Sequence, residues 1–119
     1  MMKLNIDSYD NWSVLWNVAE NPNTSTETLK TLATDEDSTV RWRVAINPNT
    51  PVETLQSLAT DGECYVRWCV AQNPSISAEV LQILATDENS HVRWYVGRHS
   101  NATELIRRLV LMTDSKLVQ

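Results

Sequence analysis

Pairs of aspartate and arginine recur along the chain, and these charged side chains have the types and spacing that could do chemistry. Each pair is an aspartate followed six residues later by an arginine: Asp35 and Arg41, Asp61 and Arg67, Asp87 and Arg93. A guanidinium presents five donors in a planar fork, so it can bridge two carboxylates or a carboxylate and nearby carbonyls. The pattern therefore predicts a structural ladder of ion pairs, with a clamp for a phosphate or carboxylate ligand as the alternative.

Each of these arginines is followed directly by a tryptophan: Trp42, Trp68 and Trp94. Adjacent arginine and tryptophan side chains could form a stacking platform for nucleic-acid bases or a cation–π site. A large aromatic side chain repeated once per unit can equally be a spacer between units, and we favour that interpretation. Trp12 and Trp16 stand at the open end of the chain, so they are candidate partner contacts.

The remaining reactive side chains do not form a catalytic or metal-binding set. Cys64 and Cys69 are five residues apart, so on one helix they would point about 140° apart and could not share a metal ion. His91 and His99 fall in different segments without another ligand at suitable spacing. We therefore expect two ordinary thiols, no metal, no cofactor and no enzymatic activity.

The charged and aromatic rows are positioned by a unit that repeats with a period of 26 residues. Asn-Pro begins at positions 21, 47 and 73, Leu-Ala-Thr-Asp at 32, 58 and 84, and Val-Arg-Trp at 40, 66 and 92. A fixed period of this size indicates stacked units that bury their apolar faces against one another. The predicted single domain has a partial repeat or cap over 1–20, full repeats over 21–46, 47–72 and 73–98, and a degenerate repeat or cap over 99–119.

A first helix is predicted in each unit from an apolar stripe with helical spacing. The stripe is Leu29, Leu32 and Ala33 in the first unit, Leu55, Leu58 and Ala59 in the second, and Leu81, Leu84 and Ala85 in the third. Residues at i, i+3 and i+4 share one helix face, so these side chains should form the core.

Start signals for this first helix differ between the units. In the middle unit, Thr50 is the predicted N-cap, Pro51 fits the first helical position, and Glu53 completes a capping box. Thr24 repeats the signal. In the third unit an isoleucine occupies the capping place, which leaves Ser77 as a weaker candidate.

A second short segment follows in each unit, from about Glu63 to Ala71 in the middle one. It is too short to persist alone, so it must be held by packing or wind partly as a 3₁₀ helix. At 100° per residue, the positions that vary between units fall on one arc. We interpret that arc as an outward face that binds a partner through Arg43, Tyr65, Gln72, His91, Tyr95 and Arg98.

The ends read as imperfect copies of the unit, as the caps of a repeat stack do. Near the N-terminus Val14, Trp16, Val18 and Ala19 match the second segment, with Leu15 in place of the arginine. After the third unit, the predicted apolar stripe of the C-terminal cap is Leu105, Ile106, Leu109 and Val110.

The charge and composition of the chain limit which kinds of partner are expected. The formal net charge is −5, which disfavours non-specific binding to nucleic acid or anionic membranes. The first residues lack the apolar stretch of a signal peptide, and nowhere do about 18 apolar residues run together. We therefore expect a cytoplasmic protein whose partner is another protein, with a homodimer through one end of the stack as a further option.

The unit Asn-Pro-Asn-Thr-Pro-x-Glu-x-Leu-x-x-Leu-Ala-x-Asp, followed by Val-Arg-Trp-x-Val-Ala, resembles the leucine-rich repeat variant family over about residues 12–112. The resemblance implies an all-α, right-handed superhelical solenoid of two-helix repeats, alternating α with 3₁₀ or short α helices, without a sheet. It implies a scaffold without catalytic residues. The aspartate and arginine spacing also resembles the ladder of HEAT-type repeats.

Two functions of different classes remain open at this point. The first is a non-enzymatic scaffold that binds another protein through the variable arc. The alternative is a nucleic-acid-binding repeat protein that uses the arginine and tryptophan rows. An enzyme of helical-repeat fold acting on DNA would need a catalytic acid on a basic face, and no feature of the sequence supports one.

Overall fold

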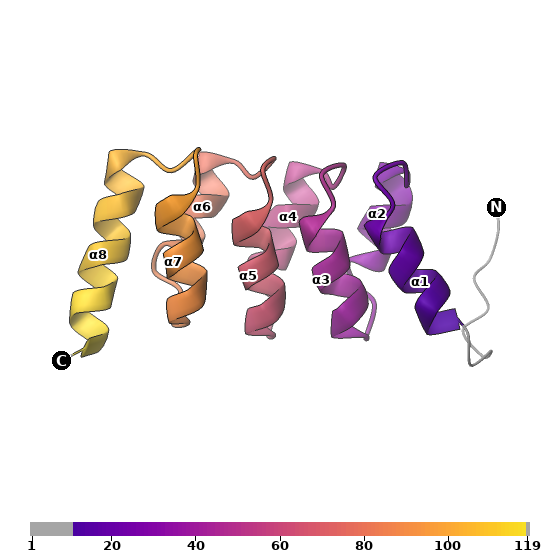
Figure 1. Cartoon of the computed structure of the whole chain (residues 1–119), viewed down its shortest axis with the longest axis horizontal. Coiled ribbons are helices and arrows are strands. Elements are labelled where there is room, and N and C mark those ends of the chain that lie inside the picture. Colours follow the sequence, from indigo (N-terminus) through magenta and orange to yellow (C-terminus); the bar gives the residue numbers. More distant parts are fainter. Residues whose placement is uncertain (1–10, 119) are drawn as a thin grey trace.

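The computed structural model describes the backbone of residues 11–118, which form eight α-helices and no strand (Figure 1). The helices are α1 (Asn11–Glu20), α2 (Thr26–Leu32), α3 (Ser38–Ile46), α4 (Val52–Leu58), α5 (Cys64–Gln72), α6 (Ala78–Leu84), α7 (Ser90–Arg98) and α8 (Glu104–Val118). The predicted all-α class is confirmed. The second segments are α-helical rather than 3₁₀, because after a first turn the amide N–H bonds return to the residue four positions back, as in Arg41 to Asp37.

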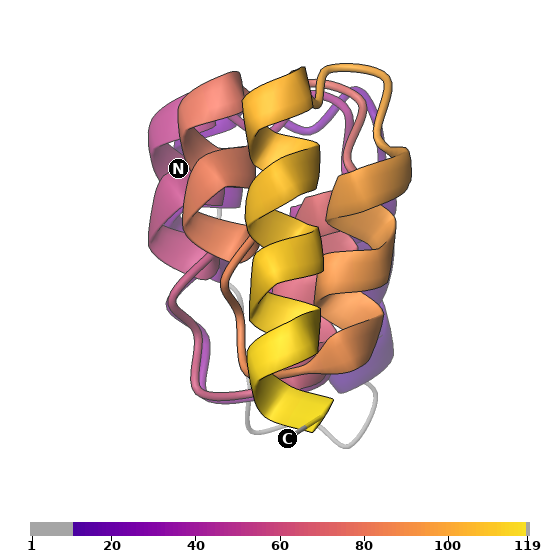
Figure 2. The ribbon, with the colours of Figure 1, turned by 90° about the vertical axis from the view of Figure 1, so that its left-hand side faces the viewer.

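The helices lie in two layers. α1, α3, α5 and α7 stand side by side in a front row, and α2, α4 and α6 lie behind them (Figure 1). Consecutive front helices contact one another directly, whereas each back helix mainly contacts front helices. The end view shows α8 upright at the end of the molecule, in front of the gap between the two layers (Figure 2), and it contacts both α6 and α7. None of the helices within residues 11–118 combines the length and apolar character that a membrane crossing requires.

A continuous apolar core fills the space between the layers. All nine side chains of the predicted leucine and alanine stripe are buried, so that prediction is confirmed. The front helices contribute a matching set of fully buried valines: Val40, Val44, Val66, Val70, Val92 and Val96. Each unit thus buries one face of both its helices against the other layer and its neighbours.

The predicted capping threonines do not cap their helices. α4 begins after Pro51, which occupies the N-cap position without a side-chain hydrogen bond. Thr50 is buried, and its hydroxyl donates 2.7 Å to the carbonyl of Val44 at the end of α3; Thr24 donates in the same way to Val18. The prediction is wrong at both positions because a buried carbonyl at a helix end needs a donor.

Serines cap the two other back helices. Ser25 accepts from the N–H of Thr28 at the start of α2, and Ser77 accepts from Val80 at the start of α6. The weaker candidate of the third unit is therefore the actual cap, and the middle unit, with the strongest signal, has none.

The predictions for the two ends of the chain differ in how well they agree with the structure. At the N-terminal end, α1 is the first described helix and stands in the front row, and Leu15 is buried at the position where the repeat has an arginine. In α8, Ile106 and Val110 are buried and Leu109 packs partly against the core, but Leu105 is 60% exposed. Its assignment to the core stripe is wrong because it lies about 100° from Ile106 around the helix.

Candidate functional site

The aspartates and arginines meet in the turns that lead from a back helix to the next front helix. Arg41 donates from Nε and Nη2 to the carboxylate of Asp61, at 2.7 and 3.3 Å, and from Nη1 to the carbonyl of Asp35 at 2.8 Å. Arg67 repeats this arrangement with the carboxylate of Asp87 and the carbonyl of Asp61. Each arginine therefore joins its own unit to the carboxylate of the following one.

The two ends of this ladder depart from the pattern. Arg93 donates to Asp114 of α8, which lies outside the repeat and was not identified from the sequence. The side chain of Asp114 is 46% exposed, compared with 10% for Asp61 and 8% for Asp87. At the other end, no preceding arginine reaches Asp35, and its carboxylate accepts the backbone N–H of Asp37.

The ladder arginines are held by the protein itself. The hydrogen bond with Asp61 raises the pKa of Arg41, and the bond with Asp87 raises the pKa of Arg67, although burial acts in the opposite direction. A raised arginine pKa means that both side chains stay charged at every pH used in a biochemical assay. Because their donors already face protein acceptors, these arginines are poorly placed to clamp an external phosphate.

A second ladder, formed by asparagines for which the sequence suggested no role beyond marking the start of each unit, runs through the turns on the opposite edge. The buried side chain of Asn47 donates to the carbonyls of Ala19 and Asn21 at 2.8 and 2.9 Å. Asn73 makes the equivalent bonds to Ala45 and Asn47. Each asparagine thus satisfies two carbonyls of the equivalent turn, 28 and 26 residues earlier in the chain.

His99 continues this ladder where the repeat ends. Its Nε2 lies 2.9 Å from the carbonyl of Asn73, and its Nδ1 accepts the N–H of Asn101 at 3.0 Å. These contacts fix the tautomer with the proton on Nε2. The signal was present in the sequence, because His99 stands in the register of Asn47 and Asn73.

The predicted partner-binding arc is only partly an outward face. Tyr65, Gln72, His91 and Arg98 are exposed. In the row formed by Arg43, Cys69 and Tyr95, however, the cysteine is buried and the other two side chains are half-buried. That row was wrongly assigned to the outward face: the Arg43 guanidinium lies 5.0 Å from the ring of Trp16, and the Tyr95 ring lies 5.6 Å from that of Trp68, in each case a tryptophan of the preceding front helix.

Five aromatic side chains gather on α5 and α7, and we call them the front aromatic cluster: Tyr65, Trp68, His91, Trp94 and Tyr95. Trp68 is at its centre, with ring centroids 5.0 Å from Tyr65 and 5.5 Å from the stacked ring of His91. The Trp94 ring meets Tyr95 edge-on at 4.9 Å. The indole N–H of Trp68 makes no hydrogen bond within the described part of the chain, so ring packing holds the cluster together.

The other tryptophans are engaged with basic or acidic side chains. The guanidinium of Arg43 lies between the rings of Trp16 and Trp42, 5.0 and 4.5 Å from their centroids, and forms an ion pair with Glu20. Trp16 also donates to Asp37, so it does not stand free at the open end. The side chain of Trp12 lies outside the described residues.

The two cysteines should react at different rates. Cys69 is buried, and desolvation raises the pKa of its thiol to about 11, whereas Cys64 is half-buried at the start of α5. Because the thiolate is the reactive form, we expect iodoacetamide at neutral pH to add one equivalent quickly and a second only on unfolding. Intact-mass spectrometry would measure this, and two equally fast additions to the folded protein would contradict it. The Cys64→Ser variant, as a control, should lose the fast addition.

Within the described residues, no group of three or more histidine, cysteine or acidic side chains is placed to hold a metal ion. Comparison of the chain with protein-family models, curated proteins and solved structures found no match.

Proposed function

We propose that this chain is a non-enzymatic helical-repeat scaffold, a right-handed solenoid of 26-residue units, whose front face binds another protein. The observation that carries the proposal is the front aromatic cluster, in which Tyr65 is 60% and Trp94 49% exposed. Tyrosine and tryptophan are enriched at protein interfaces, because they bury much surface at little conformational cost. A cluster of them on consecutive helices suits a protein partner.

The two ladders support this proposal because they make the face rigid. The aspartate–arginine ladder ties the units together along one edge and the asparagine ladder along the other. Side chains on the front helices are therefore held at fixed separations before a partner arrives. Such pre-organisation lowers the entropy cost of binding.

A capture experiment with a double variant tests the proposal. We expect the Tyr65→Ala, Trp94→Ala variant to lose at least about tenfold of the partner retained by the parent protein, as the loss of two interface aromatics implies. The matched control is Val52→Ala, Ile83→Ala, which removes two exposed apolar side chains from the back helices. Quantitative mass spectrometry of captured proteins would measure both. Equal capture by the two folded variants would show that the front face is not the binding surface.

Nucleic-acid binding is the second candidate, because Arg43 and Arg98 lie on tryptophan rings of the front face. Against it, the ladder arginines already contact carboxylates, and the chain carries a net charge of −5. We therefore expect no binding of single- or double-stranded nucleic acid tighter than about 10 μM near physiological salt, at the weak end of non-specific affinities. A fluorescence-anisotropy titration measures this, and submicromolar binding that weakens steeply with salt would favour the nucleic-acid function instead.

A further inference from the structure

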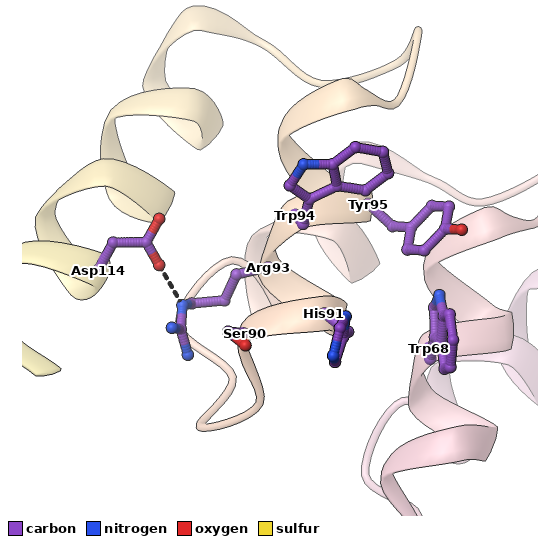
Figure 3. A pocket seen from close by; sticks show the side chains of 7 residues that line it. All are labelled: Trp68, Ser90, His91, Arg93, Trp94, Tyr95 and Asp114. Carbon is purple, nitrogen blue, oxygen red and sulfur yellow. Dashed lines mark hydrogen bonds and ion pairs between the residues drawn. The ribbon is translucent and has the colours of Figure 1, made fainter. Parts of the chain in front are cut away.

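A hollow opens on the front face at the place where the repeat ends, between α5, α7 and α8. It has a volume of about 760 Å³ and is lined by Trp68, Ser90, His91, Arg93, Trp94, Tyr95 and Asp114 (Figure 3). α8 carries no tryptophan to follow Trp94, so that ring remains more exposed than Trp42 and Trp68. The hollow thus presents aromatic rings that have no neighbouring unit to cover them.

In the ion pair between Arg93 and Asp114, which lines this hollow, the carboxylate is more exposed than the guanidinium. The side chain of Arg93 is 6% exposed, while that of Asp114 is 46% exposed. One carboxylate oxygen of Asp114 accepts from Arg93, and the other has no hydrogen bond within the described residues. Aromatic faces also carry negative electrostatic potential. A cation is therefore the ligand that both the carboxylate and the rings favour.

The molecule already contains one filled site of the same composition. Between α1 and α3, the guanidinium of Arg43 lies against the rings of Trp16 and Trp42 and pairs with the carboxylate of Glu20. The open hollow also combines aromatic rings with a carboxylate, but in a different arrangement: Tyr95 stands in the register of Arg43 and its ring packs against Trp68 and Trp94, while the carboxylate comes from Asp114 of α8. Arg43 thus shows within this molecule that a guanidinium can pack on tryptophan rings and pair with a carboxylate at once.

We propose that this hollow binds an arginine side chain of a partner protein, with the guanidinium against the rings of His91 and Trp94 and donating to Asp114. This inference rests on the proposed protein-binding function. A planar guanidinium can stack on a ring and pair with a carboxylate at once, which a lysine ammonium does less well. Arg98 already lies over Trp94, but one guanidinium covers only one face of an indole. The net charge of −5 also favours the approach of a basic partner segment.

Short peptides test the proposal without knowledge of the partner. The probe is the acetylated, amidated peptide Gly-Ser-Arg-Ser-Gly, and its analogues carry lysine, citrulline or four consecutive prolines in place of the arginine. Binding would be followed by NMR through the indole N–H signals of the tryptophans. The signal that is absent from the spectrum of Trp94→Leu is the signal of Trp94. We expect the arginine peptide to shift the Trp94 signal and to bind at least fivefold more tightly than citrulline, which has the same shape without charge.

Variants locate the site. Asp114→Asn and Trp94→Leu should each weaken the arginine peptide at least fivefold, whereas Glu104→Gln, which removes another exposed carboxylate of α8, should leave it unchanged. Thermal unfolding checks that each variant is folded. Because Trp94 is half-exposed, we expect Trp94→Leu to fold, so this variant still tests the proposal if Asp114→Asn unfolds. Equal binding of arginine and citrulline peptides, preference for the proline peptide, or no shift with any peptide would overturn the inference. If peptides fail while the front-face double variant still loses its partner, only the arginine inference is wrong.

Discussion

Replacing Asp87 with alanine is expected to cost about 3–5 kcal/mol of unfolding free energy, because it leaves a buried guanidinium without its carboxylate. Asp87 accepts two bonds from Arg67 and one from the backbone N–H of Asn89. Arg67 is only 9% exposed, and the exposed carboxylate of Glu88 reaches its Nη2 only at 3.9 Å, so the lost bonds are poorly replaced. The loss would be a large part of the about 5–15 kcal/mol that stabilises a typical domain. Chemical denaturation followed by circular dichroism would measure it.

Two further variants make this prediction specific. Glu104 and Arg108 form an exposed ion pair one helical turn apart, so Glu104→Ala should cost no more than about 0.5 kcal/mol. Adding Arg67→Met to the Asp87→Ala variant should restore part of the loss, since it removes the unpaired charge. Similar losses from Asp87→Ala and Glu104→Ala would mean that the ladder does not stabilise the fold.

Leu58→Ala is expected to destabilise the protein by about 2–5 kcal/mol, the cost of lost burial together with the cavity that remains. Leu58 is 2% exposed and faces the core from the last residue of α4. Gln56 lies on the exposed side of the same helix, so Gln56→Ala should change stability by less than about 0.5 kcal/mol. Thermal unfolding of the two variants would compare them directly, and equal shifts would contradict the assignment of the helix face.

How far the sequence predicts the structure depends on how local each interaction is. The leucine stripe was predictable because helical spacing alone determines which residues share a face. The threonine caps were not, since Thr50 can either cap its own helix or satisfy the carbonyl of Val44, and the second depends on burial that the local sequence does not show. In the same way, the place of Cys69 depends on how closely α5 packs against its neighbours.

The candidate site shows the same limit. The repeated positions of Arg41, Arg67 and Arg93 suggested a ladder, but Asp114 carries no repeat signal and is brought to Arg93 only by the packing of α8 on α7. The aromatic side chains of the hollow were visible in the sequence as variable or repeated positions. Their gathering around Trp68 follows from the side-by-side arrangement of α5 and α7.

Both ladders connect residues at constant offsets: 20 positions for the arginine carboxylate bonds of Arg41 and Arg67, and 26 and 28 positions for the asparagine bonds. A duplicated segment of one period would therefore bring every partner it needs and would meet the old chain with copies of bonds that already exist. The length of the molecule can grow by whole units without a redesign of its ends. Each added unit would lengthen the front face and, because the stability of such an array is roughly the sum of its unit and interface terms, would also add its own contribution to stability.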